Sequence, residues 1–266
     1  MQVPPIEAAA IEQFALSISV PIFLDVGASG ELRATGTLFK IAGRYFLITA
    51  RHVFDDLPDL TKLAVAESPL SGGIFTLGDF MLLKPTEEHV DVAAIEFKSM
   101  ETIVKFERNW KFLSLENVAS AYQVTGDATF FVSGYPSSLI KREASLIKGK
   151  FVTAYTQRLY SPPAEAIAPV SPELDMFFDY ARDATLLTGE VVETPKLPGV
   201  SGASVWAIRA VSGVWSPEAA IRVVGIQSAY LHSKYIRVKS WLAVAKMLES
   251  ADHELADAIR AKLHEI

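Results

Sequence analysis

The sequence predicts an all-β fold of two β modules, each of about a hundred residues, with helices confined to the two ends of the chain. Short segments rich in β-branched and aromatic residues recur from residue 18 to 104 and again from residue 128 to 239, separated by turn-forming residues. With 266 residues, the chain is long enough for one compact β unit or for two fused halves. We expect residues 1–120 to form the first unit and residues 121–266 the second.

The expected elements follow from the apolar periodicity. Helical spacing predicts a short amphipathic helix over residues 6–14 and further helices from Trp241 onward. The Pro-rich residues 161–172 are expected to form a surface loop, because proline has no N–H to donate to a neighbouring strand. The expected strands are residues 18–24, 33–41, 44–50, 62–66, 79–83 and 91–97 in the first module, and 128–136, 144–155, 174–181, 203–208, 221–230 and 235–239 in the second.

Composition limits the classes of function. The net charge is −6 at pH 7 and no run of Lys and Arg is present, so no nucleic-acid partner is expected. The chain has no cysteine, which excludes disulfides and thiolate chemistry and suits a reducing compartment. No basic residue precedes Arg33, unlike in a secretory signal, and the longest apolar stretch, residues 14–24, is too short for a membrane helix. We therefore expect a cytoplasmic protein without a membrane partner.

Two residues of the first module stand where a side chain can leave the core. His52 follows an apolar strand, and residues 49–54 are expected to make a tight helical turn that carries the imidazole to the edge of the module. Asp91 heads the apolar run over residues 91–97. Taken alone, His52 fits a partly buried structural histidine equally well, and Asp91 fits a turn or strand-start residue better.

Ser201 lies in a glycine-containing loop of the second module. Gly199 and Gly202 let the backbone fold tightly and direct two amide groups at one point. Such a loop fits a plain hairpin connection. It also supplies what acyl transfer needs, which is an exposed hydroxyl beside donors for a developing oxyanion.

The three stretches together resemble a known family. With TA-x-HV around His52, D-V-A-x-I at Asp91 and G-x-S-G around Ser201, the sequence resembles the chymotrypsin/trypsin-like serine peptidase superfamily, nearest to its disulfide-free bacterial members. Residues 225–230 resemble the strand that follows the nucleophile and forms one wall of the substrate pocket. The resemblance covers about residues 20–239. It implies two six-stranded antiparallel Greek-key β-barrels, with His and Asp in the first and Ser in the second.

The resemblance implies a serine endopeptidase that works through an acyl-enzyme. Ser201 would attack the carbonyl carbon, His52 would take the hydroxyl proton and pass it to the leaving group, and Asp91 would orient the imidazole. The backbone amides of Gly199 and Ser201 would form the oxyanion hole, each donor contributing about 3 kcal/mol in the transition state. No metal or organic cofactor is implied, and the implied partner is a peptide or protein substrate.

The sequence departs from the family pattern beside the nucleophile. Val200 stands where the family usually has Asp or Asn, so it cannot form the buried ion pair with a newly cut N-terminus that activates the secreted digestive members. Ala203 and Ser204 replace the Gly-Pro that usually follows. Without the anchor, the Gly199 amide is free to turn away from the oxyanion site, and activity would then depend on a ligand or an activating protein partner.

The residues expected to line the pocket for the substrate side chain are Pro195, Lys196, Gln227, Ser228 and Tyr230. Pro195 stands where trypsin-type members place an acid, so cleavage after Lys or Arg is not expected. Tyr230 stands where a glycine commonly keeps the pocket open, which favours a small or apolar residue. Lys196 and Gln227 would instead favour an acidic side chain, and the sequence leaves both specificities open. The resemblance also assigns to Ser228 the support of Asp91.

Two other functions fit parts of the sequence. A peptide-binding module that keeps the double barrel without catalysis is favoured by Val200 and Ala203, although the presence of all three triad residue types argues against it. An esterase would use residues 199–203 as a nucleophile elbow, with Asp252 and His264 downstream. That elbow needs a strand before it and a helix after it, and the sequence predicts the reverse. No group of His, Asp or Glu has metal-ligand spacing, so no metal is expected.

Overall fold

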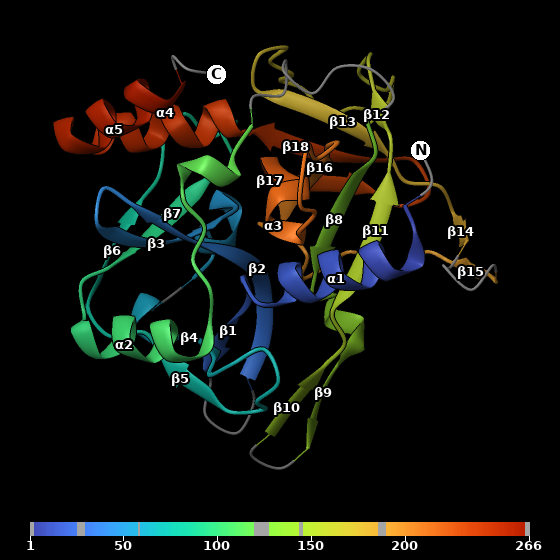
Figure 1. Cartoon of the computed structure of the whole chain (residues 1–266). Coiled ribbons are helices and arrows are strands. Elements are labelled where there is room, and N and C mark those ends of the chain that lie inside the picture. The colour runs from blue at the N-terminus through green and yellow to red at the C-terminus, as the bar shows by residue number, and fades with distance from the viewer. Residues whose placement is uncertain are drawn as a thin grey trace.

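The computed structural model describes residues 3–25, 30–57, 59–119, 128–143, 146–185 and 190–263. These residues form two curled antiparallel sheets of seven strands each, two small two-stranded sheets and five α-helices. The two large sheets lie side by side, with helices at the periphery (Figure 1). The predicted β-rich fold with helices near both ends is confirmed. Each large sheet has seven assigned strands, where the sequence predicted six.

The first large sheet has the strand order β5-β4-β1-β2-β3-β7-β6. Its edge strands β5 and β6 are separated only by residues 77–79. β5 pairs with β4 and β6 pairs with β7, so one bent stretch of chain pairs at both edges of the sheet. The strands are β1 (Ser19–Asp25), β2 (Gly30–Ile41), β3 (Arg44–Thr49), β4 (Leu63–Ala66), β5 (Ile74–Thr76), β6 (Phe80–Leu83) and β7 (Ala93–Phe97).

The second large sheet repeats this arrangement with the order β11-β8-β16-β17-β18-β13-β12. Here β11 and β12 are separated only by Gln157, and they pair with β8 and β13 respectively. If β5 and β6 are counted as one strand, and β11 and β12 as another, each sheet has six strands, numbered 1 to 6 along the chain. In both sheets these strands then lie beside one another in the order 1-2-3-6-5-4. The strands are β8 (Phe130–Gly134), β11 (Val152–Thr156), β12 (Arg158–Leu159), β13 (Asp175–Asp179), β16 (Ser204–Ile208), β17 (Ile221–Leu231) and β18 (Tyr235–Ser240).

The remaining elements connect or cover the sheets. The small sheets pair β9 (Ile140–Glu143) with β10 (Leu146–Gly149) and β14 (Asp183–Thr185) with β15 (Val191–Glu193). The helices are α1 (Pro5–Leu16), α2 (Met100–Asn109), α3 (Pro217–Ala220), α4 (Trp241–Ala251) and α5 (His253–Leu263), and the 3₁₀ helices are η1 (Arg51–Phe54), η2 (Leu60–Lys62), η3 (Leu115–Asn117) and η4 (Ser137–Leu139). The Pro-rich residues 161–172 form turns and loop, as predicted.

Helix α2 is an element that the sequence analysis missed. The Ser99 hydroxyl caps it by accepting the Thr102 N–H at 3.3 Å. Ile103 and Phe106 are buried, and the Phe106 ring stacks on Phe97 with centroids 4.8 Å apart. Its mean hydropathy is polar because only one face is apolar, and this hid it among the strand-like segments.

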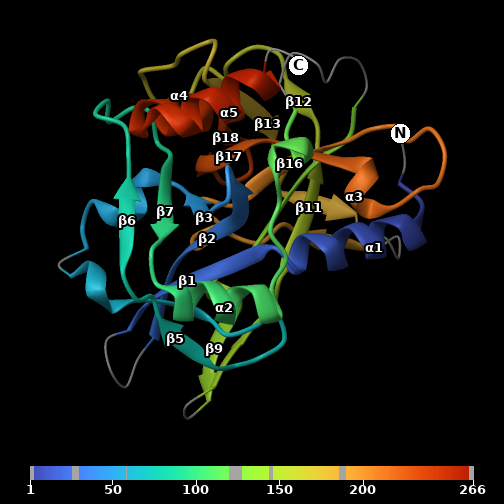
Figure 2. The ribbon, with the colours of Figure 1, turned by 60° about the vertical axis from the view of Figure 1, so that its left-hand side comes forward.

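The terminal helices cross between the two halves of the molecule. Helix α1 contacts β8 and α3, which belong to the second half, whereas α4 contacts β17, β18 and also β6 of the first sheet. Trp241 of α4 packs on Phe39 of β2 with ring centroids 4.7 Å apart, and Arg44 of β3 pairs with Asp252 between the two C-terminal helices. Both views show α4 and α5 beside the first sheet (Figures 1 and 2).

Three buried apolar clusters hold the fold. One lines the inner face of the first sheet and a second lines the inner face of the second sheet, while the third joins their outer faces to α1 and α4. Representative members are Phe23, Leu47 and Ile95 for the first, Val132, Phe178 and Val238 for the second, and Phe39, Phe131 and Trp241 for the third. Within the described ranges, no helix is long and apolar enough to cross a membrane.

Candidate active site

His52 is presented where β3 ends and η1 begins. Ala50 keeps an extended backbone, with φ −81° and ψ 144°, before the chain turns into the short helix predicted for this stretch. Val53 and Phe54 are buried and anchor the turn. Because its neighbours hold η1 on the core, the His52 side chain lies at the edge of the sheet, 45% exposed.

Asp91 meets His52 across two paired strands. Thr49 at the end of β3 lies opposite Ala93 at the start of β7, so the residues just outside these strand ends are neighbours. Asp91 Oδ2 lies 2.7 Å from His52 Nδ1, and Asp91 Oδ1 accepts the His52 backbone N–H at 2.8 Å. Both carboxylate oxygens therefore hold His52, and Nε2 is the ring nitrogen that Asp91 does not use.

The environment of His52 favours its charged form. Partial burial alone lowers the pKa of His52, but the hydrogen bond and charge of Asp91, together with the charge of Asp55, raise it, and the net pKa lies above the ordinary value. An imidazole that is stabilised after it gains a proton is suited to act as a general base.

The loop that carries Ser201 is seated on the end of β3. Gly202 has φ +86°, and a Cβ atom there would lie 1.9 Å from Thr49 Oγ1 and 2.7 Å from the Ala50 nitrogen. The Ser201 carbonyl accepts the Thr35 N–H at 2.9 Å. The Ser201 backbone thus lies beside the two residues that directly precede η1. In the part of the chain that is described, no hydrogen bond joins Ser201 Oγ to His52.

The two backbone amides predicted to form an oxyanion hole donate no hydrogen bond to any described residue. These are the N–H groups of Gly199 and Ser201, whereas the N–H groups of Val200, Gly202 and Ala203 do donate. The bonded amides are those of Val200 to Leu197 O at 2.9 Å, Gly202 to Gln227 O at 2.8 Å and Ala203 to Val200 O at 2.9 Å. The loop therefore keeps free the donors that an oxyanion requires.

The peptide that joins Pro198 to Gly199 is held from outside the loop. The Pro198 carbonyl accepts the Ser137 N–H at 2.7 Å, and the Gly199 carbonyl accepts the Thr35 hydroxyl at 2.9 Å. The N–H and C=O of a trans peptide point in opposite directions, so the Gly199 N–H points away from Ser137. These two hydrogen bonds hold the loop from η4 and from β2.

His52 and Gly199 face one open cleft of about 530 Å³. The cleft lies between β2 and η1 on one side and the segment after β8 on the other. Its lining consists of Glu31, Leu32, Arg33, His52, Val53, Asp56, Ser137, Ile140, Pro198 and Gly199. The cleft that holds the candidate base and a candidate oxyanion donor is therefore lined by β2 and η1 from the first half of the chain and by η4, β9 and the Ser201 loop from the second half.

The predicted pocket residues differ in exposure. Lys196 is exposed, and Pro195 and Tyr230 are partly buried. The Pro195 carbonyl accepts a hydrogen bond from the Tyr180 hydroxyl. Burial, with Tyr230 nearby, raises the pKa of Tyr180 to about 12. The two phenols thus lie beside the segment that leads to Ser201.

Ser228 does not contact Asp91 in the way that the resemblance implies. It is buried, and its hydroxyl donates to the Arg237 carbonyl at 3.3 Å. Within the described residues, no hydrogen bond joins Ser228 to Asp91. The Ser228 hydroxyl is directed at the neighbouring strand β18 instead, and the His52 main-chain N–H is a second donor to Asp91.

The side chains of Val200 and Arg51, two departures from the family pattern, are both largely buried. Val200 is buried in the apolar cluster inside the second sheet, where its side chain packs on Gly134. The Arg51 side chain is 11% exposed, and its nearest carboxylates, those of Asp55 and Glu88, lie 3.9 and 4.0 Å away. Val200 therefore fills space where the resemblance expects a charged anchor.

A buried charge cluster near Asp91, formed by Asp175, Arg237 and Lys239, was not predicted from the sequence. Asp175 of β13 bonds to Lys239 Nζ at 2.6 Å and to Arg237 Nε and Nη2 at 2.9 and 2.8 Å. Burial lowers the pKa of Lys239 against the opposing charges of Asp175 and Asp91. The signal was the R-V-K alternation in β18, which places Arg237 and Lys239 on one face of the strand.

Thr35 was also missed. Its hydroxyl donates to the Gly199 carbonyl and accepts the Tyr135 N–H at 3.1 Å, and its main chain binds Ser201. Thr35 and Thr37 are fully buried. The available signal was a pair of polar residues at alternate positions between the apolar residues Ala34 and Leu38.

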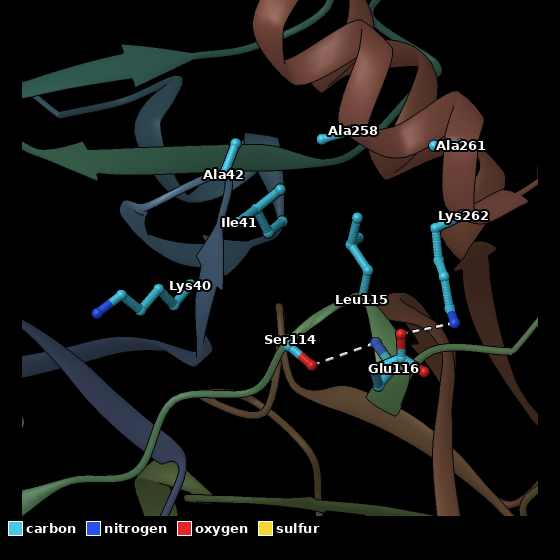
Figure 3. A pocket seen from close by; sticks show the side chains of 9 residues that line it. All are labelled: Lys40, Ile41, Ala42, Ser114, Leu115, Glu116, Ala258, Ala261 and Lys262. Carbon is cyan, nitrogen blue, oxygen red and sulfur yellow. Dashed lines mark hydrogen bonds and ion pairs between the residues drawn. The ribbon is translucent and has the colours of Figure 1, made fainter.

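A second cavity, of about 400 Å³, lies away from His52 (Figure 3). It lies between α5, η3 and the β2–β3 turn, and the charges in it pair with each other: Lys262 Nζ lies 2.6 Å from Glu116 Oε1. Lys40 is bonded to Tyr45. These pairings leave no convergent set of groups for chemistry.

Comparisons with known proteins assign no family. No protein-family model matches the chain, and no curated protein matches it. Among the described residues, no group of three or more His, Cys, Asp or Glu could hold a metal ion. The suggested esterase histidine, His264, lies outside the described residues, and Asp252 pairs with Arg44.

Proposed function

We propose that the chain is a serine endopeptidase with a chymotrypsin-like double barrel, in which Ser201, His52 and Asp91 form the triad. The observation that carries the proposal is that both oxygens of Asp91 hold His52 while Gly202 seats the Ser201 loop on the residues directly before η1. A base that is oriented by a carboxylate, next to a serine with free amides, has the parts that acyl transfer needs.

The strand pairing supports the barrel part of the proposal. In each large sheet, one bent stretch of chain pairs with strands at both edges, and this pairing supports a ring of six strands. The two rings share the order 1-2-3-6-5-4, which is an antiparallel Greek-key arrangement. We infer two six-stranded barrels joined near residues 120–127, which lie outside the described ranges.

In the proposed reaction, Ser201 Oγ attacks the substrate carbonyl carbon and its proton passes to His52 Nε2. The carbonyl oxygen becomes an oxyanion that accepts the N–H groups of Gly199 and Ser201. His52 then gives the proton to the leaving amine as the C–N bond breaks, and an acyl-enzyme forms. Water, deprotonated by His52, releases the acid and restores Ser201.

Labelling by a fluorophosphonate tests the proposal. The parent protein is expected to label, and Ser201→Ala is expected to lose the label completely. Ser212→Ala removes an exposed loop serine and should label like the parent. A parent that does not label, or a Ser201→Ala variant that still labels, would contradict the proposal.

A peptide-binding module without catalysis is the second candidate. The observation that favours it is that no hydrogen bond joins Ser201 Oγ to His52 in the described part of the chain. Binding of peptides by a parent that takes no label would support this candidate. An esterase is disfavoured because coil precedes Ser201 and β16 follows it, opposite to the order of a nucleophile elbow.

A further inference from the structure

Gln227 carries a buried side-chain amide that has no hydrogen-bond partner within the described part of the chain. Its residue exposure is 0%, and neither Oε1 nor Nε2 has a hydrogen-bond partner among the described residues. An unpaired amide in an apolar environment costs about 1–3 kcal/mol on mutational scales. Folded proteins rarely carry this cost without a reason, which is often a ligand or an internal water.

The Gln227 side chain is directed into the second sheet, beside the nucleophile loop. It lies opposite Val238 of β18, and cross-strand partners share a face. Val238 belongs to the apolar cluster on the inner face, together with Val200 and Ala203. The main-chain carbonyl of Gln227 accepts the Gly202 N–H at 2.8 Å, and the main-chain N–H of Gln227 donates to the Ala203 carbonyl at 2.8 Å. The main chain of Gln227 is therefore fixed beside the two residues that follow Ser201.

The cations of β18 and the Ser201 loop lie away from this inner face. Arg237 and Lys239 flank Val238 in sequence, so their side chains lie on the opposite face of β18, where Asp175 holds them. Lys196 is exposed. A carboxylate bound at Gln227 would thus be buried without a cation, which is strongly unfavourable. A carboxamide, in contrast, has an NH₂ group that donates to Gln227 Oε1 and a carbonyl oxygen that accepts from Gln227 Nε2, and it carries no charge.

We propose that Gln227 is a specificity-determining residue that selects a carboxamide side chain, Gln or Asn, immediately before the scissile bond. This inference rests on the proposed peptidase function. Because Gln227 is fully buried, a substrate side chain can reach it only if a neighbour moves, and Tyr230, which is partly buried and packs on the same inner cluster, is the side chain that we expect to rotate. The acidic and the small apolar specificities that the sequence left open are both disfavoured by this geometry.

The test is a set of peptides that differ only in the residue before the bond: Gln, Asn, Glu, Leu or Met. The parent is expected to show a kcat/KM at least about tenfold higher for Gln or Asn than for Leu, Met or Glu, because an apolar side chain leaves the amide unpaired. Gln227→Leu keeps the approximate shape and removes both polar atoms. This variant is expected to prefer Leu or Met.

Two measurements separate specificity from folding. Gln227→Leu should be at least as stable as the parent in thermal unfolding, since it removes unpaired buried polar atoms. Ser19→Ala removes a different unpaired buried polar group, the Ser19 hydroxyl of β1, and should leave the peptide profile unchanged.

The outcomes distinguish this inference from the function on which it rests. Fluorophosphonate labelling with equal rates for Gln and Leu peptides, or with a preference for Glu, overturns the role of Gln227 and leaves the peptidase standing. An unchanged profile in Gln227→Leu does the same and assigns the amide to an internal water. Absence of both labelling and cleavage overturns the two proposals together.

Discussion

Asp91 holds His52 at two points, through the ring at 2.7 Å and through the backbone N–H at 2.8 Å. The contact with the ring selects the tautomer that carries the proton on Nδ1. The contact with the backbone N–H keeps the carboxylate in place when the ring moves. A single side chain therefore controls both the orientation and the basicity of the candidate base.

The first prediction concerns pH. Neutral His52 accepts the proton, and its pKa is raised, so kcat/KM should increase with pH around a midpoint above the ordinary value of about 6.5. Asp91→Asn should move this midpoint down and reduce kcat by on the order of 10⁴. A pH–rate profile of parent and variant measures both effects. A midpoint that Asp91→Asn leaves in place would contradict the electrostatic role of Asp91.

The second prediction concerns Gly202. Gly202→Ala should destabilise the protein and abolish labelling, because the new methyl group would overlap Thr49 and displace the loop. Gly213→Ala is a matched control, since Gly213 also has positive φ, at +103°, but has no atom within 4 Å of the new Cβ. The control should lose about 1–2 kcal/mol and keep its label. Equal losses of stability in urea unfolding would show that the close contact at Gly202 is unimportant.

The third prediction concerns Thr35. Thr35→Val keeps the shape but removes the hydroxyl that joins the Gly199 carbonyl to the Tyr135 N–H, so about 1–3 kcal/mol of stability should be lost. The rate of fluorophosphonate labelling should fall with it, because Gly199, whose N–H is a proposed oxyanion donor, loses the hydrogen bond to its carbonyl. Thr35→Ser restores the hydroxyl and should recover the labelling rate. Failure of Thr35→Ser to recover it would assign the effect to packing.

The fourth prediction concerns the charge cluster. Asp175→Asn leaves Arg237 and Lys239 buried without their carboxylate and should cost about 3–5 kcal/mol at neutral pH. Burial opposes the charged form of Asp175, but the hydrogen bonds from Arg237, Lys239 and Ser171 outweigh it, and the pKa of Asp175 is lowered.

A group with a lowered pKa stabilises the fold fully above its unfolded value of about 3.9, and this contribution disappears as the pH falls through the folded value. The acid loss of stability should therefore be smaller in Asp175→Asn than in the parent, as measured by urea unfolding from pH 7 to pH 2. Glu173→Gln breaks only an exposed pair with Lys246 and is the control, with little expected change. A similar pH dependence in Asp175→Asn and parent would contradict this assignment.

Periodicity was sufficient for most of the fold. The alternation of apolar residues predicted every strand of the two large sheets except β5 and β12, and the helical spacing predicted α1 and α4. It could not show that residues 77–79 and Gln157 bend a single stretch of chain onto both edges of a sheet, because sheet closure depends on pairing between distant strands. Helix α2 was missed because its apolar face is narrow and lies between strand-like segments.

Only part of the candidate site could be predicted from the sequence. His52, Asp91 and Ser201 could be selected because short motifs surround them, and the structure brings His52 into contact with Asp91 and the Ser201 loop to the end of β3. The support by Thr35, the salt bridges of Asp175 and the unpaired amide of Gln227 arise from contacts between residues far apart in the chain. No local pattern encodes such contacts.

The crossing of α1 and α4 means that the two halves are fastened by opposite ends of one polypeptide. Cutting the connection between the halves would leave them assembled, since α1 stays attached to the second half while α4 still touches the first. Neither half could slide or swing away without unpacking a terminal helix. The cleft between them should therefore respond to substrate by rearranging side chains and not by opening like a hinge.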